Sequence, residues 1–196
     1  MTVVSVLAAV AVILVATTLR APEMPSYPPT PPAPVEVGAR KVGSITVTVD
    51  ASAGDKWVYF DFSRSSVVES PGPWEWDLAF RRYRIIANGG PGFAGEGGVL
   101  PLPGAQFDSV AAVPKTGYVV THDEGDSLNS ALERWYAYSW TSHVLKPKQV
   151  VYALRTADGR YAKLQILGYY CPGARAGCLT LRYVYQGAGG ADVGTP

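Results

Sequence analysis

The chain has 196 residues, a formal net charge of +1 and a hydrophobic content of 47%. This length allows one globular domain with an appendage, and the 21 glycines, 16 prolines and 12 tyrosines favour strands and tight turns over helices. Nucleic acid is not expected as a partner, because phosphate binding normally requires a marked basic excess.

The chain begins with an apolar segment. Residues 2–19 carry no charge, and as a helix they would reach about 27 Å, close to the thickness of the hydrocarbon core of a bilayer. A cleaved signal peptide is the alternative, but no Lys or Arg precedes the apolar residues, and the sequence at 16–18 is a poor cleavage site. We therefore predict a transmembrane anchor at 1–20 that contacts the lipid bilayer through residues 2–19.

Segments of biased composition lie on both sides of the predicted domain. The prolines at 21–42 favour extended polyproline II geometry, so we predict a semi-rigid spacer there. A ligand for a proline-recognising domain is the alternative. Residues 188–196 are rich in glycine and have little apolar surface to bury, and we predict a disordered tail.

The folded unit is predicted over 43–187 as a mostly β, antiparallel domain. Residues 44–49 alternate polar and apolar side chains, as a half-buried strand does. Further β-branched or aromatic stretches lie at 57–62, 76–80, 83–86, 118–120, 149–156, 161–170 and 179–186. Asp158-Gly159 between two of them predicts a hairpin turn. A short helix is predicted only within 127–140, where apolar residues recur at helical spacing.

Cys171 and Cys178 flank a short loop between two predicted strands. A disulfide at the tip of a hairpin fits this spacing and implies an oxidising compartment. Free thiols or half of a zinc site are the alternatives, and no other Cys or His lies near in sequence to complete a zinc site.

The charges next to the apolar segment bear on orientation. Arg20, Arg40 and Lys41 follow that segment, and by the positive-inside rule they would hold the domain in the cytoplasm. The predicted disulfide favours the opposite side. We predict a single-pass protein of the cytoplasmic membrane with its domain on the periplasmic, extracytoplasmic side.

Several motifs resemble the HmuY family of bacterial haem-binding proteins. The chain reads WDLAFRRY at 76–83, opens a glycine-rich stretch with Asn-Gly-Gly at 88–90, and contributes YALRT at 152–156 and YAKLQI at 161–166. The resemblance covers about 57–186 and leaves the anchor and spacer outside. It implies an HmuY-like β domain, exposure outside the cytoplasm, no enzymatic activity and, in the haem carriers of the family, iron held by two axial side chains.

The two histidines of the chain, His122 and His143, are the candidate haem ligands. They lie between the Asn-Gly-Gly motif and the later hairpin, where the resemblance implies the ligands, and two neutral imidazoles can saturate a haem iron. The aromatic residues nearby that could stack on the macrocycle are Trp135, Tyr136, Tyr138 and Trp140. The alternative is two surface histidines beside core aromatics. Met1 and Met24 do not replace them, because they lie at the terminus and in the spacer.

No catalytic residue and no metal site are predicted. Neither a Ser-His-Asp nor a Cys-His arrangement has local support in the sequence. The acidic residues Asp123, Glu124 and Asp126 lack the spacing of an EF-hand loop. We therefore expect a protein that is not an enzyme.

Two functions remain open at this point. The first is an accessory, structural subunit whose anchor and domain dock on a larger membrane protein complex, photosynthetic or respiratory, with integral membrane subunits as partners and Tyr169 and Tyr170 as contacts. The second is a tethered haem-binding protein that uses His122 and His143. The anchor favours the first, because a free haem carrier gains nothing from a rigid tether.

Overall fold

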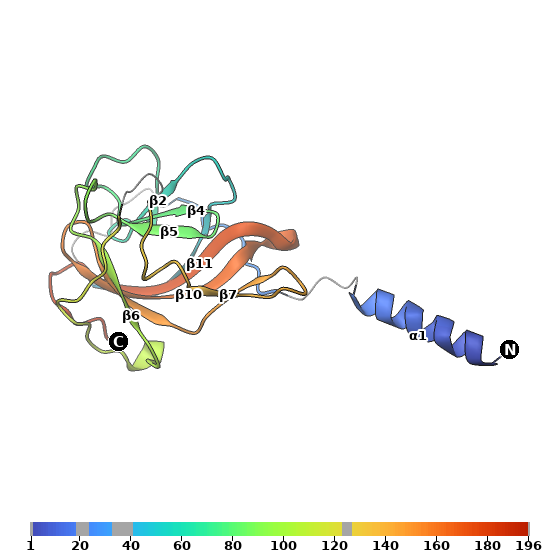
Figure 1. Ribbon diagram of the computed structural model, residues 1–196. Coiled ribbons are helices and arrows are strands. Elements are labelled where there is room, and N and C mark those ends of the chain that lie inside the picture. The colour runs from blue at the N-terminus through green and yellow to red at the C-terminus, as the bar shows by residue number, and fades with distance from the viewer. Residues whose placement is uncertain (1, 19–23, 33–40, 123–126, 196) are drawn as a thin grey trace.

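The computed structural model describes residues 2–18, 24–32, 41–122 and 127–195 (Figure 1). The elements within these ranges are α1 (Thr2–Thr18), β1 (Lys41–Asp50), β2 (Val58–Asp61), β3 (Ser66–Val68), β4 (Leu78–Arg81), β5 (Arg84–Ala87), β6 (Gly98–Leu102), η1 (Phe107–Ser109), β7 (Tyr136–Tyr138), β8 (Leu145–Pro147), β9 (Val151–Arg155), β10 (Tyr161–Cys171), η2 (Pro172–Ala174) and β11 (Arg175–Gln186).

The N-terminal apolar segment forms α1, which extends away from the strands in Figure 1. α1 has 17 residues, and at the usual rise it is about 25 Å long, against about 30 Å for the hydrocarbon core of a bilayer. Within the described ranges, no helix has both the length and the apolar character needed to span a membrane. The structure therefore does not support the transmembrane helix predicted at 1–20.

Two antiparallel sheets pack face to face and enclose the main core. The strand order is β1-β11-β10-β9-β6 in the first sheet and β3-β2-β4-β5 in the second, and the two sheets form the two layers seen in Figure 1. Aromatic rings fill the space between them. Tyr183 of β11 meets Phe60 and Phe62 edge to face, with ring centroids 6.0 and 4.8 Å away. The predicted mostly β, antiparallel fold is confirmed.

The five-stranded sheet is covered on its second face as well. Val151 and Val184 pack there against Phe107, Val113 and Val193. Val193 is fully buried, and its backbone N–H donates to the carbonyl oxygen of residue 111 at 2.8 Å. The prediction of a disordered tail at 188–196 is therefore wrong for the residues up to Val193. Val193 fills an apolar position on the sheet and so holds this part of the tail against the domain.

The structure replaces the short helix predicted within 127–140 by turns that lead into β7. The side chain of Asn129 holds these turns, because its Nδ2 donates to the Val119 carbonyl oxygen at 3.0 Å and its Oδ1 accepts from the Ala131 N–H at 3.1 Å. An Asn side chain that bonds to the backbone in this way competes with helix formation. The hairpin predicted at Asp158-Gly159 is confirmed between β9 and β10, and Gly159 has the positive φ, 77°, that its turn requires.

The described part of the proline-rich segment, 24–32, lies on the domain. Ser26 forms a parallel bridge with Tyr170. Thr30 donates its N–H to the Thr48 carbonyl oxygen, and its Oγ1 accepts from the Thr48 N–H, both at 2.9 Å. β1 is an edge strand, so Thr48 would otherwise present unpaired backbone groups. The sequence predicted a spacer here, but residues 24–32 form a strap across the sheet.

Candidate functional site

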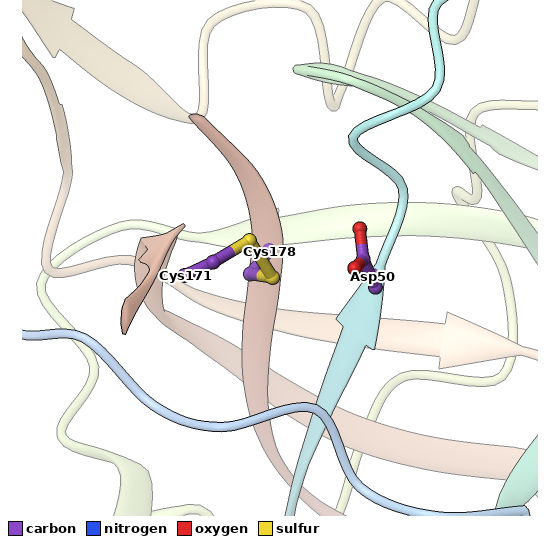
Figure 2. A group of neighbouring side chains, drawn as sticks. All are labelled: Asp50, Cys171 and Cys178. Atoms are coloured by element: carbon purple, nitrogen blue, oxygen red, sulfur yellow. A yellow bond between two sulfur atoms is a disulfide. The ribbon is translucent and has the colours of Figure 1, made fainter. Parts of the chain in front are cut away.

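Asp50 lies beside the two cysteines at the end of the β10–β11 hairpin (Figure 2). One oxygen of Asp50 and the two sulfur atoms are within 4.8 Å of one another, but Cys171 and Cys178 form a disulfide with their Cα atoms 5.0 Å apart. Bonded sulfurs are not the thiolates that a metal needs. Arg175 Nη2 donates to the Asp50 carboxylate at 2.9 Å. The predicted disulfide is confirmed, and these four residues fasten the hairpin to β1.

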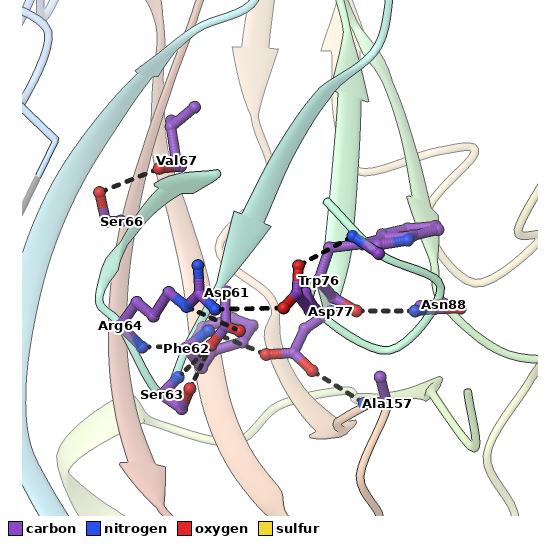
Figure 3. Close-up of polar contacts among 12 residues, drawn as sticks. Asp61, Phe62, Ser63, Arg64, Ser66, Val67, Trp76, Asp77, Asn88 and Ala157 are labelled. Atoms are coloured by element: carbon purple, nitrogen blue, oxygen red, sulfur yellow. Dashed lines mark hydrogen bonds and ion pairs between the residues drawn. The ribbon is translucent and has the colours of Figure 1, made fainter. Parts of the chain in front are cut away.

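The WDLAF motif places a buried carboxylate between the two sheets. Asp77 Oδ2 accepts a hydrogen bond from the Phe62 N–H and Oδ1 accepts one from the Ala157 N–H, both at 2.8 Å (Figure 3). Phe62 follows β2 of one sheet, and Ala157 follows β9 of the other. Burial, together with the nearby charge of Asp61, raises the pKa of Asp77 to about 7. Asp77 therefore joins the two sheets.

Asn88 of the Asn-Gly-Gly motif holds the neighbouring loops. Its Nδ2 donates to the carbonyl oxygens of Trp76 and Pro73, both at 2.8 Å. Gly89 lies so close to the next loop that a Cβ atom there would be 2.0 Å from the Gly97 carbonyl oxygen, so only glycine fits. Asp77 and Asn88 of the motifs that carry the family resemblance thus belong to the buried framework of the fold.

A cavity of about 460 Å³ opens beside the β7–β8 hairpin. We call it the aromatic groove; its lining includes Tyr83, Tyr136, Tyr138, His143, Tyr169 and Tyr170. These residues come from the β4–β5 turn, the β7–β8 hairpin and the end of β10. The groove therefore exists only when segments from three parts of the chain come together.

Trp135 forms the base beneath the aromatic groove. It is fully buried, its Nε1 donates to the Tyr83 carbonyl oxygen at 2.8 Å, and its ring meets Tyr136 and Tyr169 edge to face at 5.0 and 5.6 Å. Burial raises the pKa of Tyr169 to about 12, so its phenol stays neutral near pH 7. The groove is thus a mainly aromatic surface on a fixed support, with the cationic side chain of Arg82 in its lining.

His143 lines the aromatic groove from the β7–β8 loop. Its Nδ1 forms a hydrogen bond with the Tyr138 hydroxyl, and its backbone has a φ of 54°, a region that residues other than glycine rarely occupy. When Nδ1 carries the proton and donates to Tyr138, the lone pair lies on Nε2. The imidazole can then offer Nε2 to a metal, oriented by a hydrogen bond on its other nitrogen.

His122 is among the described lining residues of neither the aromatic groove nor a second cavity, of about 440 Å³. Its backbone forms two hydrogen bonds with Leu128, at 2.9 and 3.0 Å, and Leu128 lines that cavity. The second cavity shares Tyr83 and Tyr136 with the aromatic groove. The two predicted ligands are therefore placed differently, because His143 lines the groove whereas His122 is only bonded through its backbone to Leu128, a residue of the second cavity.

The aromatic residues singled out in the sequence also separate in the structure. Tyr136 and Tyr138 line the aromatic groove, but Trp135 lies beneath it. Trp140 is 82% exposed and packs edge to face on Tyr138 with centroids 5.1 Å apart. Tyr169 and Tyr170 were expected to be exposed contacts for a docking partner, but both side chains are buried.

Other cavity residues escaped the sequence analysis. Tyr83, Arg84, Arg134 and Lys148 line the second cavity, yet they lie in three separate parts of the sequence, since only Tyr83 and Arg84 are neighbours. Arg134 was assigned to a predicted helix, where its neighbours would have been different. No local signal in the sequence links these residues.

Comparison with known proteins places the chain in a family. The family model described as HmuY protein matches residues 53–183, more than half of the chain. The chain belongs to the HmuY family. The resemblance seen in the sequence motifs is confirmed.

Three solved structures share the fold of this HmuY family member. One is classed as a lipoprotein (BF2707) from Bacteroides fragilis, with 22% identity, a TM-score of 0.59, and coverage of 74% of this chain and 91% of the other. Another is classed as an HmuY-like haem-binding protein from Bacteroides vulgatus, with 24% identity, a TM-score of 0.58, and coverage of 74% and 92%. The third is the apo HmuY analog TFO from Tannerella forsythia, with 15% identity, a TM-score of 0.56, and coverage of 75% and 97%. None of the curated proteins compared with the chain matches it.

Proposed function

We propose that this protein binds haem in the aromatic groove, with His143 as an iron ligand. Its membership of the HmuY family and its similarity to a Bacteroides vulgatus protein classed as haem-binding support this function. The proposal reverses the order of the two functions weighed from the sequence, in which the docking subunit came first. Docking on integral membrane subunits and contact with a bilayer through 2–19 stay predictions.

The residues of the groove fit a haem group. Its volume of about 460 Å³ lies within the range of about 300–1,000 Å³ that is usual for small-molecule sites. Tyrosine rings offer flat apolar surface to a macrocycle, and a neutral imidazole is a common axial ligand of haem iron. When bound, haem supplies an iron that accepts a nitrogen lone pair.

The observation that carries the proposal is the pairing of His143 with Tyr138 at the wall of the groove. Histidines that bind metals usually have the second ring nitrogen fixed by a hydrogen bond, which sets the tautomer and the direction of the ring. The positive φ of His143 is a backbone strain of the kind that concentrates at functional sites. His122 is proposed as the second ligand, in keeping with the histidine pair predicted from the sequence.

The proposed role is that of a non-enzymatic haem carrier outside the cytoplasm. The Cys171–Cys178 disulfide supports an oxidising compartment, and the similarity to a Bacteroides fragilis protein classed as a lipoprotein supports an extracytoplasmic location. Both are independent of the haem site itself.

A haem titration of the purified full-length chain tests the proposal. The wild type should develop a shifted Soret band that saturates, and His143→Ala should weaken haem binding at least tenfold, because an iron ligand is removed. His122→Ala reports separately on the second ligand, and Ser142→Ala, next to His143 on the exposed loop, is the matched control. Metal-free protoporphyrin should bind both His143→Ala and the wild type equally. Unchanged haem affinity in the His143→Ala variant would overturn the assignment.

A further inference from the structure

Two exposed aromatic side chains form a patch on the β7–β8 hairpin. Trp140 is 82% exposed and Tyr138 is 40% exposed, and their rings pack edge to face with centroids 5.1 Å apart. Trp140 is not among the described residues that line the aromatic groove, so the proposed haem site gives it no role. An exposed aromatic pair of this kind indicates a contact surface.

The end of this hairpin, residues 139–142, is uncharged, and we call it the hairpin tip. It reads Ser-Trp-Thr-Ser, and no acidic residue occurs within 136–148. The Ser142 hydroxyl donates to the Ser139 hydroxyl at 2.8 Å, and the Ser139 hydroxyl also bonds to that of Thr141 at 3.3 Å. Polar groups that bond to one another cost less to remove from water than free ones. The tip can therefore approach an apolar phase.

The hairpin is fastened to the domain behind its tip. The Ser139 N–H donates to the Val144 carbonyl oxygen at 2.9 Å, and Val144 is buried. The Leu145 N–H donates to the Tyr170 hydroxyl, also at 2.9 Å. These bonds hold the tip in one position, so that little conformational entropy is lost when it binds a surface.

The apolar helix α1 is joined to the domain close to this hairpin. α1 has no charged residue, and large apolar side chains along it are exposed, such as Val12 at 68%. Met24 is six residues after Thr18, the end of α1, and a fully extended chain of that length spans at most about 22 Å. Met24 lines a cavity together with Leu145 of β8. A surface that buries the end of α1 therefore lies near the hairpin.

We propose that the hairpin tip contacts a lipid bilayer, with Trp140 in the headgroup region. Tryptophan and tyrosine favour this region, because the ring is apolar while its N–H or O–H stays in contact with water. Lys146 is exposed on β8, where its ammonium can meet an anionic headgroup. A bilayer is favoured over a protein partner because one lipid surface takes up both α1 and the aromatic tip.

The contact goes beyond the proposed haem binding and does not depend on it. The Tyr138 ring meets Trp140 on the hairpin tip and also His143 in the groove, where the ring centroids are 5.9 Å apart. A tip that contacts the bilayer therefore brings the His143 side of the aromatic groove to the lipid surface.

Quenching of tryptophan fluorescence by brominated lipids tests the contact. The five tryptophans of the chain lie at 57, 74, 76, 135 and 140, so α1 and the strap contribute no signal. The full-length chain is reconstituted in vesicles of phosphatidylcholine and phosphatidylglycerol, with bromine either near the headgroup or near the end of the acyl chains. We expect bromine near the headgroup to reduce the emission by the share that Trp140 contributes. Bromine near the end of the chains should reduce it less.

Two variants assign the signal to the hairpin tip. Trp140→Phe should emit equally in brominated vesicles and in vesicles without bromine, because it lacks the tryptophan that meets the lipid. Trp74→Phe is the matched control, since Trp74 is 58% exposed and lies between β3 and β4, in the other sheet. This variant should be quenched by as much as the wild type.

The outcomes separate this proposal from haem binding. A wild type that does not float with the vesicles, or that emits equally with and without bromine, overturns the lipid contact and makes the tip a surface for a protein partner. Quenching that persists unchanged in Trp140→Phe also overturns it, because another face of the domain then meets the lipid. Haem titration of the same chain without vesicles tests the proposed function by itself.

Discussion

The network around Asp77 and the groove around His143 use polar side chains in opposite ways. Asp77 and Asn88 are buried, and backbone groups satisfy their side chains. His143 and Arg134 are exposed at cavities. The buried residues of the family motifs therefore maintain the fold, whereas Tyr83, at the end of the first motif, lines the groove beside His143. Recognition of the family identifies the architecture before it identifies the site.

Removal of the Asp77 carboxylate should give the largest effect on stability. Asp77→Ala leaves the N–H groups of Phe62 and Ala157 buried without acceptors, and each such group costs about 1–3 kcal/mol. We expect the free energy of unfolding to fall by about 3 kcal/mol, measured by urea denaturation. Asp55→Ala, at an exposed position, should change it by less than about 0.5 kcal/mol. An Asp77→Ala chain as stable as the wild type would contradict the bridging role.

Loss of the disulfide should have the next largest effect. The bond closes a loop with a sequence separation of 7, and the chain-entropy model gives about 2 kcal/mol for a loop of this size. Replacing both Cys171 and Cys178 by Ser should lower the thermal unfolding temperature. A reductant should lower the unfolding temperature of the wild type but not that of the double variant. A reductant-insensitive wild type would argue against the bond.

The pH dependence of the free energy of unfolding should report on the buried carboxyl group of Asp77. The pKa of Asp77 is about 7 in the folded chain, against an ordinary value of 3.8, so the folded state binds this proton more tightly than the unfolded state. The resulting stabilisation is fully present below about pH 4 and is lost as the pH rises toward 7, by up to about 1 kcal/mol per pH unit. Asp77→Asn should remove this slope, as judged by urea denaturation at pH 4.5 and pH 7. An equal slope in both chains would refute the assignment.

The strap should contribute less than the network. Thr30→Val removes the hydroxyl that accepts from the Thr48 N–H while it keeps the shape of the side chain, and a net loss of about 0.5–1 kcal/mol is expected. Thr116→Val, at an exposed site, serves as the control in the same denaturation experiment. If both variants unfold alike, the strap does not stabilise the domain.

The cavity charges should have the smallest effect on stability. Arg134→Gln changes an exposed side chain, so we expect less than about 0.5 kcal/mol in the free energy of unfolding. A much larger loss, measured by urea denaturation, would show that Arg134 supports the fold. The contrast between the buried Asp77 network and the exposed cavity residues would then no longer hold.

Much of the fold could be predicted because its signals are local. Alternation at 44–49 marks a part of β1, Asp158-Gly159 marks the turn between β9 and β10, and the spacing of the cysteines fits a hairpin tip. Each of these depends on residues that are neighbours in the chain. The helix predicted within 127–140 failed because apolar spacing alone does not reveal that Asn129 bonds to the backbone of Val119.

The sequence by itself determined the β architecture, the disulfide and the family, since strand periodicity, turn chemistry and motifs are properties of short segments. Only the tertiary structure decided that Val193 enters the core, that residues 24–32 cross the sheet, and that His143 lines a groove whose neighbour carries Arg134 and Lys148. These features depend on contacts between segments far apart in the chain. Their energy comes from burial and hydrogen bonds that no local pattern encodes.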